Sequence, residues 1–214
     1  MALSVVLVDD HAVVRAGICR LIESTGEFEV VAEAADGRAA VEAVQRTKPA
    51  LVVMDIWLPK LSGIDATRQI RQAVPATKVV ILSQHERPDI VESALREGAS
   101  GYVHKGGAPE DLLAALRWVH QGKCFLSPEI AGGIVGAVSR PPQERGQPVS
   151  RLSSREREVL QLIADGLSSK EVASELGVST RTAETHRFSL MNKLGIHKVA
   201  GLVRFAVREG LIAP

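Results

Sequence analysis

The most constraining feature of this sequence is a short apolar run that ends in a carboxylate, Leu51-Val52-Val53-Met54-Asp55. Four apolar residues without polar alternation are typical of a strand that is buried on both faces of a parallel sheet. Open α/β sheets bind their ligands at the carboxyl ends of such strands. Asp55 is therefore a candidate site residue. Strands also often end in a capping aspartate, so its meaning depends on the residues that accompany it.

Residues 1–121 repeat this strand pattern and alternate it with helical patterns. Apolar runs that predict strands fall at 5–8, 29–34, 51–54, 79–82 and 101–103. Helical periodicity falls between and after them, at 13–23, 38–46, 64–74, 90–97 and 110–120. Glycines and prolines separate the segments. Five such units predict an α/β domain with a doubly wound, five-stranded parallel sheet and helices on both faces.

Charge and composition suggest two domains with different tasks. The 214 residues carry a net charge of +1, but residues 1–121 have 13 Lys and Arg against 16 Asp and Glu, whereas residues 122–214 have 13 against 9. A basic second half suits a polyanionic partner. Cys19 and Cys124 lack CxxC spacing, which favours a reduced compartment over a disulfide framework or zinc site. Without a signal peptide or an apolar run of about 18 residues, we expect a cytoplasmic protein that does not bind membranes.

The ends of four predicted strands carry polar residues of complementary kinds: Asp9 and Asp10, Asp55, Ser83 and Lys105. Each alone could be a strand cap, but a doubly wound sheet brings all of these ends to one edge. Two carboxylates about 4 Å apart repel by roughly 4 kcal/mol at an effective dielectric constant near 20, so a cation is expected among them. Oxygen ligands with open positions suit Mg²⁺, beside which a carboxylate can attack phosphorus. The set predicts a phosphoryl-accepting site.

The motifs of this half resemble a bacterial response-regulator receiver domain of flavodoxin-like fold over residues 1–121; they are Val8-Asp9-Asp10-His11, Met54-Asp55, Pro59, Gly63, Ser83, Gly98-Ala99-Ser100-Gly101-Tyr102 and Lys105. The resemblance implies that Asp55 accepts a phosphoryl group from a sensor histidine kinase. It also implies a magnesium site formed by Asp10, Asp55, Asp9 (through water) and the main chain of Trp57.

The same resemblance implies that Ser83 and Lys105 bind the phosphoryl group and that Tyr102 is an aromatic switch that turns inward. Tyr102 could equally be a partly buried strand residue. Two positions depart from the family pattern: Gln84 is often small in such domains, and Trp57 is bulky. One hypothesis is that both slow the access of water or of the phosphodonor. The alternative is that they only fill space.

Residues 122–149 are predicted to be a linker with one possible short helix at 128–139. The segment 140–149 has three prolines and one glycine and almost no apolar residues, as in a semi-rigid, solvated connection. A second domain is expected at 150–214. Ser153 with Glu156 and Ser168 with Glu171 match the capping box, and helices are predicted at 154–165, 169–176, 180–193 and 198–209. Their spacing fits a helix-turn-helix, although a generic helical hairpin would satisfy it too.

The helical wheel of residues 180–193 has two distinct sides. Ala183, His186, Leu190 and Leu194 share the side that should face the core. The other side and its surroundings contain the candidate DNA-binding residues: Lys170, Thr180, Arg181, Thr182, Glu184, Thr185, Arg187, Phe188, Asn192 and Lys193. Of these, the cations Lys170, Arg187 and Lys193 are the best placed for phosphates.

This half resembles a LuxR-type helix-turn-helix through Leu152–Leu160, Ala164-Asp-Gly166, Ser169–Ala173, Thr182–Arg187, Met191–Leu194 and Glu209–Ile212. With a receiver in front, the arrangement is that of the NarL/FixJ response regulators. The resemblance implies double-stranded DNA as a partner and pairing into a homodimer through an apolar stripe on the last helix. Candidate dimerisation residues are Val199, Leu202, Val203 and Ala206, although the same stripe could simply close the core.

The sequence therefore predicts a transcriptional regulator of a two-component system that is switched by phosphorylation of Asp55 and is not an enzyme. One alternative keeps DNA binding but uses the receiver only for protein contacts. Another makes the first domain a phosphohydrolase. Such enzymes often need a second carboxylate two residues after the nucleophile, and that position is Trp57.

Overall fold

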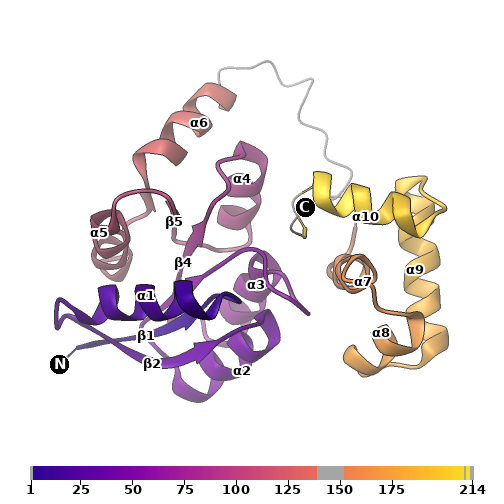
Figure 1. Ribbon diagram of the computed structural model, residues 1–214, viewed down its shortest axis with the longest axis horizontal. Helices are drawn as coiled ribbons and strands as arrows, with labels where there is room; N and C mark the ends of the chain where they lie inside the picture. Colours follow the sequence, from indigo (N-terminus) through magenta and orange to yellow (C-terminus); the bar gives the residue numbers. More distant parts are fainter. Residues whose placement is uncertain (1, 139–151, 210, 213–214) are drawn as a thin grey trace. The chain divides into compact units, whose positions relative to one another are not determined.

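A computed structural model describes residues 2–138, 152–209 and 211–212, and these form two compact units (Figure 1). The first unit contains β1 to α6 and the second contains α7 to α10. The segment 140–149, predicted to be a solvated linker, lies outside the described residues.

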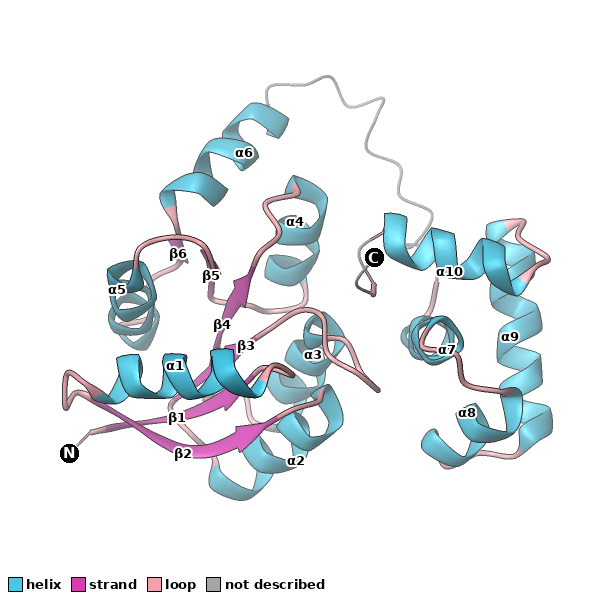
Figure 2. Ribbon diagram, in the orientation of Figure 1, coloured by secondary structure: helices cyan, strands magenta, loops and turns pink. Residues whose placement is uncertain are grey.

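The first unit alternates strands and helices, as Figure 2 shows. Its strands are β1 (Leu3–Val8), β2 (Phe28–Ala34), β3 (Leu51–Met54), β4 (Lys78–Ser83), β5 (Gly101–His104) and β6 (Phe125–Leu126). Its helices are α1 (Ala12–Glu23), α2 (Gly37–Thr47), α3 (Gly63–Ala73), α4 (Pro88–Arg96), α5 (Pro109–His120) and α6 (Pro128–Val138). All strand pairs are parallel, in the order β2-β1-β3-β4-β5-β6. The predicted doubly wound parallel sheet is confirmed.

The central strands are buried on both faces. On one face, Val5, Leu7, Leu51 and Val53 join a core with residues of α1 and α5, among them Ile22 and Leu116. Successive side chains of a strand point to opposite faces, which places Val52 and Met54 toward the other helical layer. Both of these side chains are also fully buried. This packing explains why β3 is apolar without alternation.

The sheet has six strands and not the predicted five. β6 has two residues, and Phe125 and Leu126 pair in parallel with Gly101 and Tyr102 of β5. A strand of two residues is too short to show alternation in the sequence, which is why the pattern did not reveal it. The short helix predicted at 128–139 corresponds to α6.

The second unit has four helices, α7 (Ser154–Ala164), α8 (Ser169–Glu175), α9 (Thr180–Leu194) and α10 (Val199–Arg208). Both predicted capping boxes are present, Ser153 with Glu156 and Ser168 with Glu171, and Ser179 caps α9. Gly195 ends α9 in the left-handed conformation, with φ of 65°. The unit has its own aliphatic core, built from residues such as Leu160, Val172, Leu190 and Leu202. Among the residues that the structure describes, none of the helices in either unit could cross a membrane.

Candidate functional site

The carboxyl ends of β1, β3 and β5 bring two carboxylates and an ammonium together. Lys105, directly after β5, places its Nζ 2.7 Å from Asp9 Oδ2 and 2.6 Å from Asp55 Oδ2. Asp9 is 1% exposed and Asp55 is 8% exposed, so both charges are held at a nearly closed edge of the sheet. The predicted grouping of Asp9, Asp55 and Lys105 is therefore what the structure shows.

Burial and ion pairing oppose each other at this edge. Burial raises the pKa of the Asp55 carboxyl above its usual value, against the opposite effect of Lys105. For Lys105, burial acts to lower the pKa, but the ion pairs with Asp55 and Asp9 outweigh it, and the pKa is raised. Lys105 is thus charged at neutral pH, and it compensates two carboxylates with one positive charge.

Asp10 completes the acidic cluster from the more exposed side. Ligand atoms of Asp9, Asp10 and His11 all lie within 4.8 Å of one another. The main-chain N–H of His11 donates to Asp9 Oδ1 at 2.8 Å, and His11 Nδ1 lies 2.7 Å from Asp10 Oδ1. The main chain after β1 therefore fixes the orientation of Asp9, while Asp10 remains accessible to a ligand.

Gly63 lets the chain pass close to the candidate phosphoacceptor. Its N–H donates to the carbonyl of Ile56 at 2.7 Å. A Cβ on Gly63 would lie 1.8 Å from the carbonyl oxygen of Asp55, which is an impossible contact. The glycine is required here because any side chain would displace the main chain of Asp55.

Ser83 and Tyr102 lie deep in the same part of the unit. Ser83 is 1% exposed, and its Oγ accepts a hydrogen bond from the His85 N–H at 3.2 Å. Tyr102 is fully buried, and its hydroxyl donates to the His85 carbonyl at 2.7 Å. Burial raises the pKa of Tyr102, which keeps the hydroxyl protonated as a donor. The ring thus points inward, as a fully buried residue of strand β5.

His85 is a site residue that the sequence did not reveal. Its ring stacks on Trp57, with ring centroids 3.8 Å apart and an interplanar angle of 25°. Trp57 is half-buried, and its buried Nε1 has no hydrogen-bond partner among the residues that the structure describes. Gln84 is exposed and takes no part in the stack. One signal in the sequence could have revealed His85. It lies two residues after Ser83, just as Trp57 lies two residues after Asp55.

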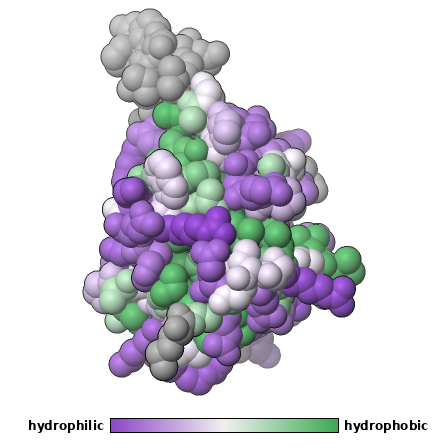
Figure 3. Space-filling view, turned by 90° about the vertical axis from the view of Figure 1, so that its left-hand side faces the viewer, coloured by the Kyte–Doolittle hydropathy of each residue, from purple (hydrophilic) through white to green (hydrophobic). Residues whose placement is uncertain are grey.

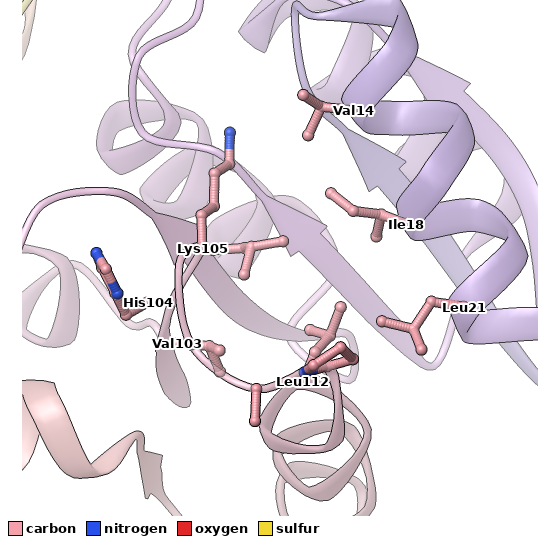
Figure 4. Close-up of a pocket in the computed structure, with 11 residues that line it drawn as sticks. Val14, Ile18, Leu21, Val103, His104, Lys105 and Leu112 are labelled. Atoms are coloured by element: carbon pink, nitrogen blue, oxygen red, sulfur yellow. The ribbon is translucent and has the colours of Figure 1, made fainter.

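A small apolar cavity lies beside this edge, between α1 and α5. Figure 4 shows Val14, Ile18 and Leu21 of α1 directed toward Val103 and Leu112, with Lys105 nearby. Its volume is about 150 Å³, below the roughly 300 Å³ of an ordinary small-molecule site. Figure 3 shows apolar groups among polar ones on one side of the first unit. Val13 of α1 and Trp118 of α5 are exposed apolar residues of this unit.

In the second unit, α9 has the two sides that its helical wheel predicts. Ala183 and Leu190 are buried, and His186 and Leu194 are half-buried. The opposite side, named here the outward face of α9, consists of residues that are all exposed: Arg181, Glu184, Thr185, Phe188 and Asn192. Lys170 and Thr180 are exposed nearby, and Thr182 Oγ1 lies 2.8 Å from the Oγ of the capping Ser179.

Two predicted cations near this face have partners inside the unit. Lys193 Nζ lies 2.8 Å from Oε2 of the buried Glu156 in α7, and Ser189 Oγ donates to the same carboxylate at 2.6 Å. Lys193 therefore holds α9 against α7, while its side chain stays 42% exposed and remains a candidate for phosphate contact. Arg187 is half-buried, and its Nη1 donates to Ser169 Oγ at 3.4 Å.

The predicted dimerisation stripe on α10 is divided. Leu202 and Ala206 are fully buried in the core of their own unit, so they cannot form a pairing surface. Val199 is 41% exposed and Val203 is half-buried. The alternative interpretation, that the stripe closes the core, holds for Leu202 and Ala206. Val199 and Val203 remain the candidates for pairing.

The sequence and structure are similar to known proteins over both units. Residues 5–117 match the response regulator receiver domain family, and residues 150–206 match the luxR family of bacterial regulatory proteins. The chain is 37% identical to the oxygen regulatory protein NreC of Staphylococcus aureus, over 98% of this chain and 99% of that protein.

Among solved structures, a LuxR-family two-component response regulator from Aurantimonas is 40% identical, with a TM-score of 0.64 over 65% of this chain and 100% of that chain. The response regulator RcsB of Salmonella typhimurium is 28% identical, with a TM-score of 0.60 over 96% of this chain and 99% of that chain. RcsB has also been solved in complex with DNA.

Proposed function

Since the chain belongs to the response regulators that join a receiver domain to a LuxR-type DNA-binding domain, we propose that transfer of a phosphoryl group to Asp55 by a sensor histidine kinase switches it. The observation that carries this proposal is the position of Lys105, whose ammonium bridges Asp9 and Asp55. A carboxylate oxygen of Asp55 attacks phosphorus, the bond from phosphorus to the kinase histidine breaks, and an acyl phosphate forms. Lys105 then moves from the carboxylates to the new phosphoryl oxygens.

The donors present fit a magnesium ion. Asp9, Asp10 and Asp55 bring three negative charges against the one positive charge of Lys105, and the remaining charge of −2 matches a divalent cation. Apart from His11, the side chains of this group offer oxygen atoms as metal ligands, and Mg²⁺ prefers oxygen. Asp10 and Asp55 would bind the metal directly, Asp9 through water, and the main chain of Trp57 would supply a further oxygen. When bound, Mg²⁺ would neutralise part of the negative charge of the phosphoryl group.

Ser83 and Tyr102 connect the phosphoryl group to the rest of the receiver. A phosphoryl group adds about −1.5 to −2 charges, and Ser83 moves toward it as a hydrogen-bond donor. That movement pulls on the β4–α4 segment, because His85 is bonded to Ser83 through its N–H and to Tyr102 through its carbonyl. Tyr102, whose hydroxyl donates to the His85 carbonyl, would follow that movement as the switch residue.

In the second unit, the outward face of α9 would enter the major groove. Arg181, Glu184, Thr185, Phe188 and Asn192 would face the base edges, while Lys170, Arg187, Thr180 and Thr182 would lie near phosphates. Two copies would pair through Val199 and Val203, so that a homodimer binds double-stranded DNA. Because its proposed partner is the bacterial chromosome, we place the protein in the cytoplasm.

A second candidate function keeps the DNA binding and uses the receiver only for protein contacts. The stack of Trp57 on His85 favours it, since Trp57 follows the phosphoacceptor by two residues and carries a second ring against it. The two functions differ in one measurable property, which is whether Asp55 accepts a phosphoryl group at all.

The test is to incubate the protein with acetyl phosphate and Mg²⁺ and to measure the mass of the intact chain. We expect one added phosphoryl group in the wild type and none in Asp55→Ala. The isolated module 150–214 should still bind DNA, because its reading face is complete without the receiver. An unmodified wild type would favour the second candidate. Failure of the isolated module to bind any DNA at low salt would contradict the DNA-binding assignment.

A further inference from the structure

The aromatic ring of Phe188 stands out on the outward face of α9, where it is 68% exposed. We propose that Phe188 recognises the C5-methyl group of one thymine in each DNA half-site. The inference rests on the proposed use of this face to read DNA, and it goes further by naming a base and a chemical group.

The surroundings of Phe188 favour a small apolar ligand group over a protein surface. The exposed residues on the same face are Arg181, Glu184, Thr185 and Asn192, all of them polar or charged. Protein-binding sites are larger, contiguous apolar patches, and a single ring among polar neighbours does not form one. In the major groove, the thymine methyl is the isolated apolar group beside hydrogen-bonding base edges. One ring among polar side chains matches that pattern.

Glu184 shows which part of the duplex this face meets. It lies one helical turn before Phe188, is exposed, and forms no ion pair with any residue that the structure describes. A carboxylate is repelled by the phosphate backbone, whereas at the base edges it can accept a hydrogen bond from the amino group of cytosine. The pair of Glu184 and Phe188 is therefore unfavourable against phosphates and favourable against bases. This orientation brings the ring to the methyl groups.

The core of the second unit does not need Phe188. Ala183 and Leu190 fill the inner side of α9, and the core of this unit is closed by buried residues such as Leu202 and Phe205. Replacing the ring should leave the fold intact, since substitutions at exposed positions away from caps and networks change stability little. The effect on DNA can therefore be measured in a folded protein.

The experiment removes the methyl group and the ring in turn. A preferred site is first selected from random DNA with the full chain, phosphorylated by acetyl phosphate. Each thymine of that site is then replaced by deoxyuridine, which lacks only the methyl, and affinities are measured by fluorescence anisotropy. For the wild type we expect one position per half-site where the replacement weakens binding about fourfold, the value of one buried methyl-sized group. For Phe188→Ala the same replacement should have no effect.

Two further variants complete the design. Phe188→Leu, which keeps an apolar contact, should retain part of the methyl dependence and provides the comparison if Phe188→Ala binds too weakly. Val31→Ala, at an exposed apolar position of β2 in the receiver, should leave the deoxyuridine pattern unchanged. Equal losses in the wild type and the Phe188 variants at every thymine would overturn the inference while leaving DNA binding in place. A wild type that binds no DNA would overturn the proposed reading face itself.

Discussion

The acidic edge of the first unit and the outward face of α9 differ in how the chain assembles them. Asp9, Asp55 and Lys105 come from positions up to 96 residues apart, and they meet in a nearly closed site where each charge has a partner. The residues of the outward face of α9 lie within one helix and are exposed to solvent. A site for a small, highly charged group is enclosed by several strands. A surface for a long polymer is presented by one element.

The comparison can be tested most strongly by removing one lysine from the acidic edge and one that lies near the outward face of α9. Lys105→Ala leaves Asp9 and Asp55 buried without their cation, and we expect a loss of about 3 kcal/mol or more in the free energy of unfolding. Lys170→Ala, at an exposed position in α8, should change it by no more than about 0.5 kcal/mol. Urea denaturation of both variants measures the difference. Equal, small losses would mean that the acidic edge tolerates unpaired charge and is more open to water than the burial of its carboxylates indicates.

A second test uses Glu156, a buried carboxylate of α7 that pairs with Lys193 of α9. Burial alone would raise the pKa of Glu156, but Lys193, Ser189 and Ser153 stabilise its charged form and lower the pKa to about 2. The folded pKa lies below the ordinary 4.5, so the stabilisation is complete above pH 4.5 and is lost as the pH falls toward 2. The gain in free energy of unfolding is limited by solvent screening, because the Lys193 side chain is 42% exposed.

Glu156→Gln should remove that pH dependence while keeping a hydrogen bond to Ser189. Urea unfolding of the module 150–214 between pH 2 and 7 is the measurement. If the wild type and the variant lost stability in parallel over that range, Glu156 would not be the group responsible. Loss of the pH dependence in Glu156→Gln would sharpen the comparison, because the ion pair of the second unit would then be structural, whereas the one in the first unit is proposed to be functional.

The smallest expected effect concerns the aromatic stack. If Trp57 and His85 shield the acyl phosphate from water, Trp57→Ala and His85→Ala should each shorten the lifetime of the phosphorylated protein by about two- to tenfold, or up to about 1.4 kcal/mol of barrier. Gln84→Ala should leave it unchanged, because Gln84 is exposed and outside the stack.

Loss of the added phosphoryl mass with time measures this lifetime. Unchanged lifetimes in Trp57→Ala and His85→Ala would show that the rings only fill space.

The sequence was most informative about features that sheet geometry and local patterns dictate. Asp9, Asp55 and Lys105 could be grouped because the ends of parallel strands share an edge, and the capping boxes of α7 and α8 are local patterns. Contacts between loops were not predictable in this way. The stack of Trp57 on His85 was one such contact, since loop conformation and not periodicity decides which ring meets which.

Periodicity also left the partner of an apolar or charged side chain undetermined. Leu202 and Val199 belong to one stripe of α10, yet the first is buried in its own unit and the second is exposed. Lys193 lies close to the outward face of α9 on a helical wheel, but it reaches Glu156 of α7. Such outcomes depend on how neighbouring helices pack, which a single helix does not specify.

The position of β6 has a practical consequence for work on the receiver alone. A fragment that stopped at residue 121 would leave the edge of β5 without its neighbour, and main-chain groups such as the Tyr102 carbonyl, which accepts from Ser127 at 3.0 Å, would be left unsatisfied. An uncovered strand edge invites pairing between molecules and aggregation. A fragment extended through Val138 keeps that edge covered and should remain monodisperse during purification.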